Sequence, residues 1–235
     1  MLPRSAHAFG EEGAFNPRIL LTGDAKWEGV RARAPGRWAD ELARRTSAPS
    51  RVQPTIVHAD EKELLAEPFV IWGGAAEAPA LTSKEIGVLK QFFSLGGILF
   101  VDDFSPDTGV FGKSARREIA RVLPENSPLS VGTEHVLFRS FYLLKRAAGR
   151  VQGPTKLDVV VRAGAVQVIY TSHDVLGALA IDSAGVNSLD VSPGGEAQRE
   201  LAIRLCVNVA MYVLCSNYKD DQVHAEHIMR RRGGK

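Results

Sequence analysis

The chain has 235 residues, with 29 lysine and arginine residues against 27 aspartate and glutamate residues, and 45% of its residues are hydrophobic. This length fits one α/β domain, and the globular composition excludes a disordered, collagen-like or coiled-coil chain. A formal net charge of +2 gives no reason to expect nucleic acid as a partner. Two cysteines are too few for a disulfide-stabilised scaffold or a four-cysteine zinc site.

Residues 1–17 contain glycine and proline and show no hydrophobic periodicity, which predicts a flexible arm. Within it, Ser5-Ala-His-Ala8 has the small-x-small pattern of a signal-peptidase site, although no apolar segment precedes it. Two interpretations stay open. Either the pattern arises by chance and the protein is cytoplasmic, or it is the remnant of a signal peptide that starts upstream and the protein is periplasmic.

The first half of the chain alternates short apolar runs with amphipathic segments. The predicted strands cover residues 18–22, 55–58, 69–72 and 98–101, and the predicted helices cover residues 35–45, 61–66, 82–95 and 114–122. One helix start is explicit, because Thr82-Ser-Lys-Glu85 has the pattern of a capping box. The alternation predicts an α/β fold with a doubly wound, mostly parallel sheet and helices on both faces. Continuously apolar strands agree with a sheet that is covered on both sides.

The second half is less regular. Residues 136–144 predict a strand, and residues 157–161 and 165–170 predict a hairpin around Arg162-Ala-Gly164. A loop over residues 182–195 precedes a long helix from about residue 196 to residue 217. We therefore expect one domain over residues 18–224, with a basic tail over residues 225–235.

The long helix contains the longest nearly apolar run of the chain, residues 201–215. This run includes Arg204 and Asn208 and is too short to span a bilayer, so it predicts a core helix and not a transmembrane segment. Along one helix, Cys206 and Cys215 lie about 13 Å apart, which is beyond the reach of a disulfide bond. We expect two free, mostly buried thiols without a catalytic role.

Polar residues follow several of the predicted strands. Binding sites in open parallel sheets form beyond the carboxyl ends of the strands, where this chain has Asp24, Gly73, Gly74 and Asp103 as ligand-binding candidates. The pair Asp102-Asp103 is the strongest feature, since such carboxylates hold a divalent cation or act as a base with a raised pKa. Only one of them faces a given pocket, because consecutive strand residues point to opposite sides. The alternative is that both carboxylates accept backbone N–H groups at a turn or helix start.

Histidines supply the remaining candidates. His173-Asp174 follows the strand at residues 165–170, and an imidazole held by a carboxylate serves as a base or a metal ligand. The alternative is that Asp174 caps a helix and His173 is satisfied in a turn. His135 precedes an apolar run and is a further candidate. No two histidines have the i, i+4 spacing of a helical metal pair, and no glycine-rich phosphate loop is present, so we expect no metal and no cofactor.

Several segments together carry a resemblance to a known family. They are residues 38–42, 68–72, 81–85, 96–104, 208–212 and 217–224. The most specific of them is Gly96-Gly-Ile-Leu-Phe-Val-Asp-Asp-Phe104. Over residues 18–224, the chain resembles the bacterial family catalogued as domain of unknown function 4159. The resemblance implies a class I glutamine amidotransferase-like fold, which is a flavodoxin-type doubly wound sheet.

The resemblance also implies that one activity is missing. Amidotransferases of this class place a cysteine on the sharp turn after a central strand and use a distant His-Pro-Glu. Here Asp102-Asp103 follows the comparable strand, and His173-Asp174 stands where the His-Pro-Glu would fall. Without a nucleophilic cysteine, glutamine hydrolysis by that mechanism is not expected. Family members carry export signals or sit in membrane-anchored chains near MoxR-type ATPase systems, which favours the periplasmic interpretation and a partner of that kind.

Two functional hypotheses follow. The first is a non-catalytic, amidotransferase-like module that binds a ligand or a protein partner in a bacterial envelope system. The second is a hydrolase or metal-dependent enzyme with an Asp/His site at the carboxyl ends of the strands. Its candidate catalytic residues are Asp102, Asp103, His135, His173 and Asp174. A sugar-binding role is a third idea that rests on fold analogy alone.

Overall fold

A mixed sheet of seven strands forms the centre of the protein. The computed structural model describes the backbone of residues 13–232 and the side chains of residues 13–216. In spatial order the strands are β2 (Ile56–His58), β1 (Arg18–Leu21), β3 (Phe69–Gly74), β4 (Ile98–Asp103), β7 (Ala165–Thr171), β6 (Leu157–Arg162) and β5 (Leu129–Val131). The first five of these run parallel, and β6 and β5 continue the sheet in antiparallel pairs. The predicted α/β class, parallel half and hairpin are confirmed.

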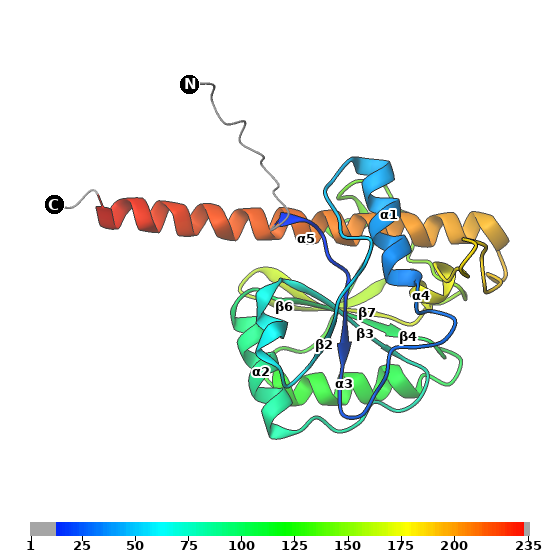
Figure 1. Ribbon diagram of the computed structural model, residues 1–235, viewed down its shortest axis with the longest axis horizontal. Helices are drawn as coiled ribbons and strands as arrows, with labels where there is room; N and C mark the ends of the chain where they lie inside the picture. The colour runs from blue at the N-terminus through cyan, green and yellow to red at the C-terminus, as the bar shows by residue number, and fades with distance from the viewer. Residues whose placement is uncertain (1–12, 233–235) are drawn as a thin grey trace.

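Helices cover both faces of this sheet (Figure 1). On one face lie α1 (Ala34–Thr46), α4 (Val175–Ala178) and α5 (Gly195–Arg232), and on the other lie α2 (Ser83–Ser94) and α3 (Val110–Val122). Successive residues of β4 point to alternate faces, so Phe100 belongs to the core under α1 and α5, whereas Leu99 belongs to the core under α2 and α3. Two hydrophobic cores therefore share one sheet, as the continuously apolar strands predicted.

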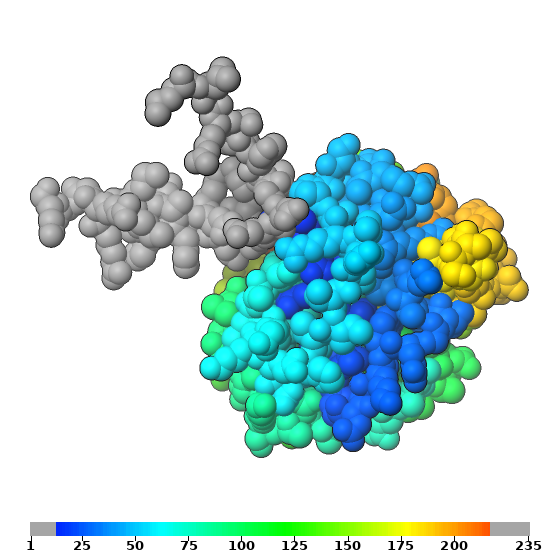
Figure 2. All heavy atoms as spheres, in the orientation of Figure 1, coloured from blue at the N-terminus to red at the C-terminus, as the bar shows by residue number. Residues whose placement is uncertain are grey.

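The surface view shows how the N-terminal half packs over the visible face. Blue and cyan atoms cover most of that face, and the yellow loop before α5 forms its edge on the right (Figure 2). None of the helices in the described part of the chain is long and apolar enough to cross a membrane.

Trp38 is central to the core between α1, α5 and the sheet. Its ring meets Phe69 and Phe100 nearly edge-on, with centroid distances of 5.7 and 5.2 Å. Its Nε1 donates a hydrogen bond to the carbonyl oxygen of Cys206 in α5 at 2.9 Å. One fully buried indole thus fixes α1 against the sheet and against α5.

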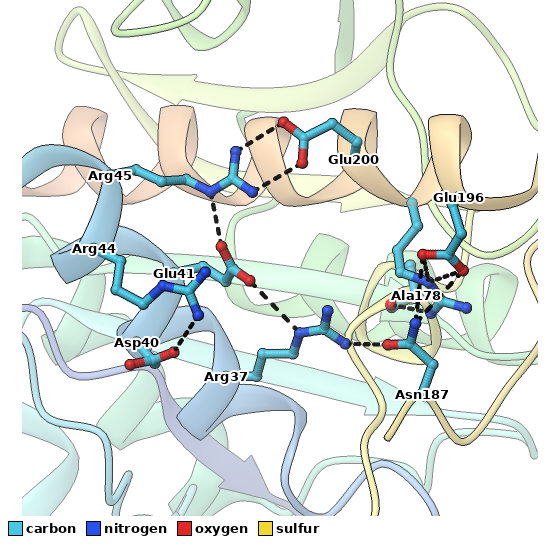
Figure 3. Close-up of polar contacts among 10 residues, drawn as sticks. Arg37, Asp40, Glu41, Arg44, Arg45, Ala178, Asn187, Glu196 and Glu200 are labelled. Atoms are coloured by element: carbon cyan, nitrogen blue, oxygen red, sulfur yellow. Dashed lines mark hydrogen bonds and ion pairs between the residues drawn. The ribbon is translucent and has the colours of Figure 1, made fainter. Parts of the chain in front are cut away.

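An ion pair joins α1 and α5 at the surface as well (Figure 3). Arg45 of α1 donates to both carboxylate oxygens of Glu200 in α5 at 2.8 Å, and its Nε donates to Glu41 at 2.8 Å. This bidentate contact with Arg45 lowers the pKa of Glu200 to about 2. Because both partners are partly exposed to solvent, the pair fixes the geometry of the two helices more than it adds to stability.

The predicted strand over residues 136–144 is wrong. The segment forms the 3₁₀ turn Val136–Phe138 and a loop that packs on α5. The side chain of Asn208 in α5 supplies the hydrogen bonds that a neighbouring strand would otherwise make with this backbone. Its Oδ1 accepts from two backbone amides at 3.2 and 2.7 Å, and its Nδ2 donates to two backbone carbonyls at 3.1 and 2.9 Å, all within residues 137–142. A distant amide thus decides the structure of an apolar run that looks like a strand.

The two ends of the domain also differ from the prediction. Most of the predicted arm over residues 1–17, including Ser5–Ala8, lies outside the described residues. Phe15 however is only 2% exposed, and its ring lies 5.2 Å from that of Phe69, so the last residues of the predicted arm pack onto the domain. At the other end, α5 continues to Arg232, past the predicted helix end at residue 217 and into the predicted tail (Figure 1).

Replacing Asn208 with leucine should lower the free energy of unfolding by about 2–4 kcal/mol, because buried backbone groups that lose their partner cost about 1–3 kcal/mol each. Urea denaturation measures this loss. The matched control is Asn187→Leu, whose side chain makes exposed contacts with Arg37 and Glu196, and it should change stability by less than about 0.5 kcal/mol. Equal losses in the two variants would contradict the role of Asn208.

Candidate functional site

Asp103, the last residue of β4, caps α3. The side chain is 1% exposed, and its two oxygens accept from the backbone N–H groups of Ser105 and Gly112, each at 3.0 Å. The N-cap residue of α3 is Gly109, which has no side chain. The carboxylate of Asp103 therefore takes the role that an N-cap side chain usually has.

Asp102 points to the opposite face and caps α4. It is fully buried and accepts from Thr171 Oγ1 at 2.7 Å and from the backbone N–H groups of Val175 and Leu176 at 3.0 and 2.8 Å. Burial, followed by the charge of Asp174, raises the pKa of Asp102 to about 7. The three hydrogen bonds act against this shift because they stabilise the ionised carboxylate. Asp102 therefore titrates near neutral pH inside the core.

Asp174 joins two arginines that lie far from each other in the sequence. It sits at the N-cap of α4 with a φ of 50°, and its Oδ1 accepts from the backbone N–H of Gly177 at 3.0 Å. Arg31 Nε donates to the same carboxylate at 2.8 Å, and Arg150 Nε forms a second ion pair with it. The guanidinium of Arg31 also lies 4.6 Å from the centroid of the Phe104 ring. Two partly exposed guanidiniums thus share one fully buried carboxylate.

No sequence motif identifies Arg31 or Arg150, because both residues lie in loops. The signal in the sequence is indirect. A buried carboxylate needs hydrogen bonds or cations to offset its desolvation, so a buried Asp174 implies basic partners without identifying them.

The histidines do not meet the carboxylates in one pocket. His173 is 1% exposed, its Nε2 lies 2.8 Å from the carbonyl oxygen of Pro154, and its Nδ1 is buried without a hydrogen-bond partner. Burial lowers the pKa of His173, so the neutral ring is favoured. His135 lines a groove of about 540 Å³ at the amino ends of β4 and β7, the edge opposite Asp103. The structure therefore does not bring Asp103, His135 and His173 together.

Gly73 and Gly74 are positions of close aromatic packing. A Cβ at Gly73 would collide with the ring of Phe104, and a Cβ at Gly74 would lie 2.6 Å from the ring of Phe111. Both glycines allow an aromatic ring to cover the end of β3. Asp24, in contrast, lies exposed in the turn after β1. Of the residues predicted to bind a ligand, Gly73 and Gly74 thus serve aromatic packing and Asp103 caps a helix, whereas Asp24 is exposed.

The cysteines differ from each other in exposure. Both are free, but Cys206 is buried whereas Cys215 is exposed, so the expectation of two mostly buried thiols is wrong for Cys215. Burial raises the pKa of Cys206 well above its ordinary value. Within the part of the chain whose side chains are described, no three histidine, cysteine, aspartate or glutamate residues form a group that could hold a metal ion.

A family model matches residues 18–214, which span the whole sheet and most of the packed part of α5. Its description is "Domain of unknown function (DUF4159)". The chain belongs to this family. The match confirms the family that the sequence segments predicted, and it assigns no activity to its members. No curated protein matches the chain.

Among solved structures, the chain is similar to "Alpha-L-fucosidase isoenzyme 2 from Paenibacillus thiaminolyticus". The TM-score is 0.36 and the sequence identity is 10%, over 86% of this chain and 32% of that enzyme. A likeness of this size carries no argument about activity.

Asp102 should make the protein less stable as the pH rises towards neutrality. Its folded pKa of about 7 lies above the ordinary value of about 3.9 in an unfolded chain. The folded state thus holds this proton more tightly. The stabilisation is complete below about pH 4 and is lost progressively up to about pH 7, by about 1–4 kcal/mol in total.

The variant Asp102→Asn lacks this titration, although it also loses part of the cap of α4. Urea denaturation of both chains between about pH 4 and pH 8 measures the difference between their free energies of unfolding. As the pH rises, the natural chain should lose stability relative to the variant. A pH-independent difference would show that the pKa of Asp102 is not raised.

Proposed function

We propose that this protein is a non-catalytic, amidotransferase-like binding module that works with partner proteins in a bacterial envelope system. The observation that carries this proposal is the engagement of three carboxylates at the carboxyl edge. Asp102 and Asp103 cap helices on opposite faces, and Asp174 caps α4 and pairs with two arginines. Carboxylate oxygens that are occupied in this way are not available as a general base or a nucleophile.

The strand order supports the amidotransferase-like part of the proposal. The parallel strands β2-β1-β3-β4-β7 follow the winding of flavodoxin-type sheets, in which the first strand lies between the second and the third. The two cysteines of the chain, Cys206 and Cys215, lie in α5 and not at the end of a strand. Both observations support a module with an amidotransferase-like fold that lacks the nucleophile of that class.

The binding part of the proposal rests on charge at the same edge. Arg31 and Arg150 keep 18% and 27% of their side chains exposed while they share the single carboxylate of Asp174. Guanidiniums that a buried acceptor holds in place favour carboxylate or phosphate groups on a partner. We propose that this edge faces an anionic group of the partner.

The alternative is a hydrolase or metal-dependent enzyme. The raised pKa of Asp102 favours it, because perturbed carboxyl groups concentrate at active sites. Against it, Asp102 is fully buried and accepts three hydrogen bonds, and Nε2 of His173 is held by a backbone carbonyl. A substrate would reach either group only after local unfolding, so the binding module is the better proposal.

The proposed location is the periplasm, and the proposed partner is a MoxR-type ATPase-associated membrane system. Support comes from the family resemblance and from Ser5-Ala-His-Ala8, which lies outside the described residues. Fractionation of bacteria that produce the protein from its natural gene tests the location. Recovery in the cytoplasmic fraction would overturn it.

Substituting Asp103 with asparagine should lower stability and remove no chemistry. The amide keeps one acceptor for the first turn of α3, so we expect a loss of about 1–2 kcal/mol in the free energy of unfolding. Asp24→Asn is the matched control, since its carboxylate lies exposed at the same edge, and its effect should stay below about 0.5 kcal/mol.

The same chains should be assayed against ester, amide, glycoside and phosphate-ester substrates, with and without divalent metal ions. We expect that none of the chains turns over any of these substrates. Turnover by the natural chain that is lost in a folded Asp103→Asn or Asp102→Asn variant would overturn the binding proposal and establish the enzyme.

A further inference from the structure

A second candidate site lies beside the carboxyl edge. A pocket of about 270 Å³ opens between the loop at residues 146–152 and the segment from Pro193 to Leu201 at the start of α5. The inner side of this loop covers His173, because Val151 N donates to the carbonyl oxygen of His173 at 3.1 Å. The apolar part of the pocket wall consists of Ala147, Ala148, Val151, Pro193, Ala197 and Leu201.

The walls of this pocket are held together by hydrogen bonds. Gln198 Nε2 donates to the carbonyl oxygens of Gly149 and Ser192 at 2.8 and 3.0 Å, and its Oε1 accepts from Gly194 N at 3.1 Å. Ser192 N also donates to the carbonyl oxygen of Arg150 at 2.9 Å. The loop and the helix start are thus fixed relative to each other, which is typical of a preformed binding pocket.

Arg146 is the charged residue of the pocket wall. Its guanidinium contacts the backbone carbonyls of Ala147 and Gly153, both at the long distance of 3.4 Å. No carboxylate of the described side chains forms an ion pair with it, and the pocket wall contains no aspartate or glutamate. Arg146 is half-buried beside these apolar side chains, so less water screens its charge than that of a fully exposed arginine, and the charge attracts an anion.

We propose that this pocket binds a small organic acid, with its carboxylate on Arg146 and a short apolar body against the alanine, valine and leucine side chains. The inference rests on the proposed function, since it gives the binding module a ligand class. The lack of an acidic side chain in the wall disfavours a free amino acid, because its ammonium group would find no counter-ion. The apolar wall likewise disfavours a multiply charged phosphate.

Isovalerate, a branched five-carbon acid, is the probe, and isovaleramide is its uncharged analogue. Titration of the full chain, followed by ¹H–¹⁵N chemical shifts, should show saturable binding of the acid, with shifts at residues 146–152 and 193–201. The amide should bind at least about tenfold more weakly, because it loses the charge-assisted contact with Arg146.

Two variants test the assignment of the site. Arg146→Gln should weaken isovalerate binding by at least about tenfold, and Ala197→Leu should weaken it by filling the pocket. Arg44→Gln is the matched control, since Arg44 is 66% exposed and pairs with Asp40 on α1, and it should leave binding unchanged. If Arg146→Gln fails to fold, Ala197→Leu still tests whether isovalerate binds in this pocket, and the comparison of acid with amide still tests the role of the carboxylate.

The outcomes separate this inference from the proposed function. Absence of saturable isovalerate binding, equal affinity for acid and amide, or binding that survives both pocket variants would overturn the inference, and the non-catalytic module would stand. Conversion of isovalerate into a product would overturn the non-catalytic proposal, whereas loss of binding in Arg146→Gln would still support the pocket.

Discussion

The end of β4 determines how helices begin on both faces of the sheet. Consecutive residues of a strand face opposite ways, so Asp102 and Asp103 send one carboxylate to each side. Asp103 meets the first turn of α3, and Asp102 meets the first turn of α4. The first N–H groups of a helix have no partner within the helix, and burying them unpaired is costly. The adjacent aspartates therefore follow from the doubly wound architecture, in which one strand end serves two helix starts.

This arrangement has an electrostatic consequence on the α4 side. Asp102 and Asp174 both cap α4, so two carboxyl groups come close together in a buried region. Arg31 and Arg150 offset the charge of Asp174 by ion pairs. Burial, followed by the charge of Asp174, raises the pKa of Asp102. The arginines at the edge are therefore needed to neutralise a buried charge that arises because two acids cap α4. Their exposed surfaces are the part that the proposed partner would contact.

The sequence predicts the parallel half of the fold well for a local reason. The strands there are mostly apolar runs that end at glycine or polar residues, with Gln167 as an interruption in β7. The capping box of α2 is confirmed by the bond from Glu85 N to Thr82 Oγ1 at 3.2 Å. The prediction fails at residues 136–144, because the deciding partner, Asn208, lies 66 residues beyond Tyr142. The prediction also lacks β5, because a strand of three residues is too short to show the two-residue hydrophobic period of a strand.

The candidate site shows the same limit. In the sequence, Asp102, Asp103 and Asp174 all follow predicted strands, a position that fits helix capping as well as catalysis. The sequence cannot distinguish the two roles, because they depend on which groups surround each carboxylate. Arg31 lies 143 residues from Asp174, and Arg150 lies 24 residues from it. Contacts of that kind belong to the tertiary structure and leave no local pattern.

The irregular second half depends on α5 as a rigid reference. Along this one helix, Gln198 holds the loop at residues 149–150, Asn208 holds the turn at residues 137–142, and Tyr212 Oη accepts from the backbone N–H at the start of β7 at 2.8 Å. Loops without regular structure are thereby placed at fixed points relative to the sheet. The loop at residues 146–152 is held in this way, and it covers His173 on one side and forms a pocket wall on the other. Because the loop is anchored on both sides, the wall keeps its shape without a bound ligand. Binding therefore costs less conformational entropy than it would with a flexible loop.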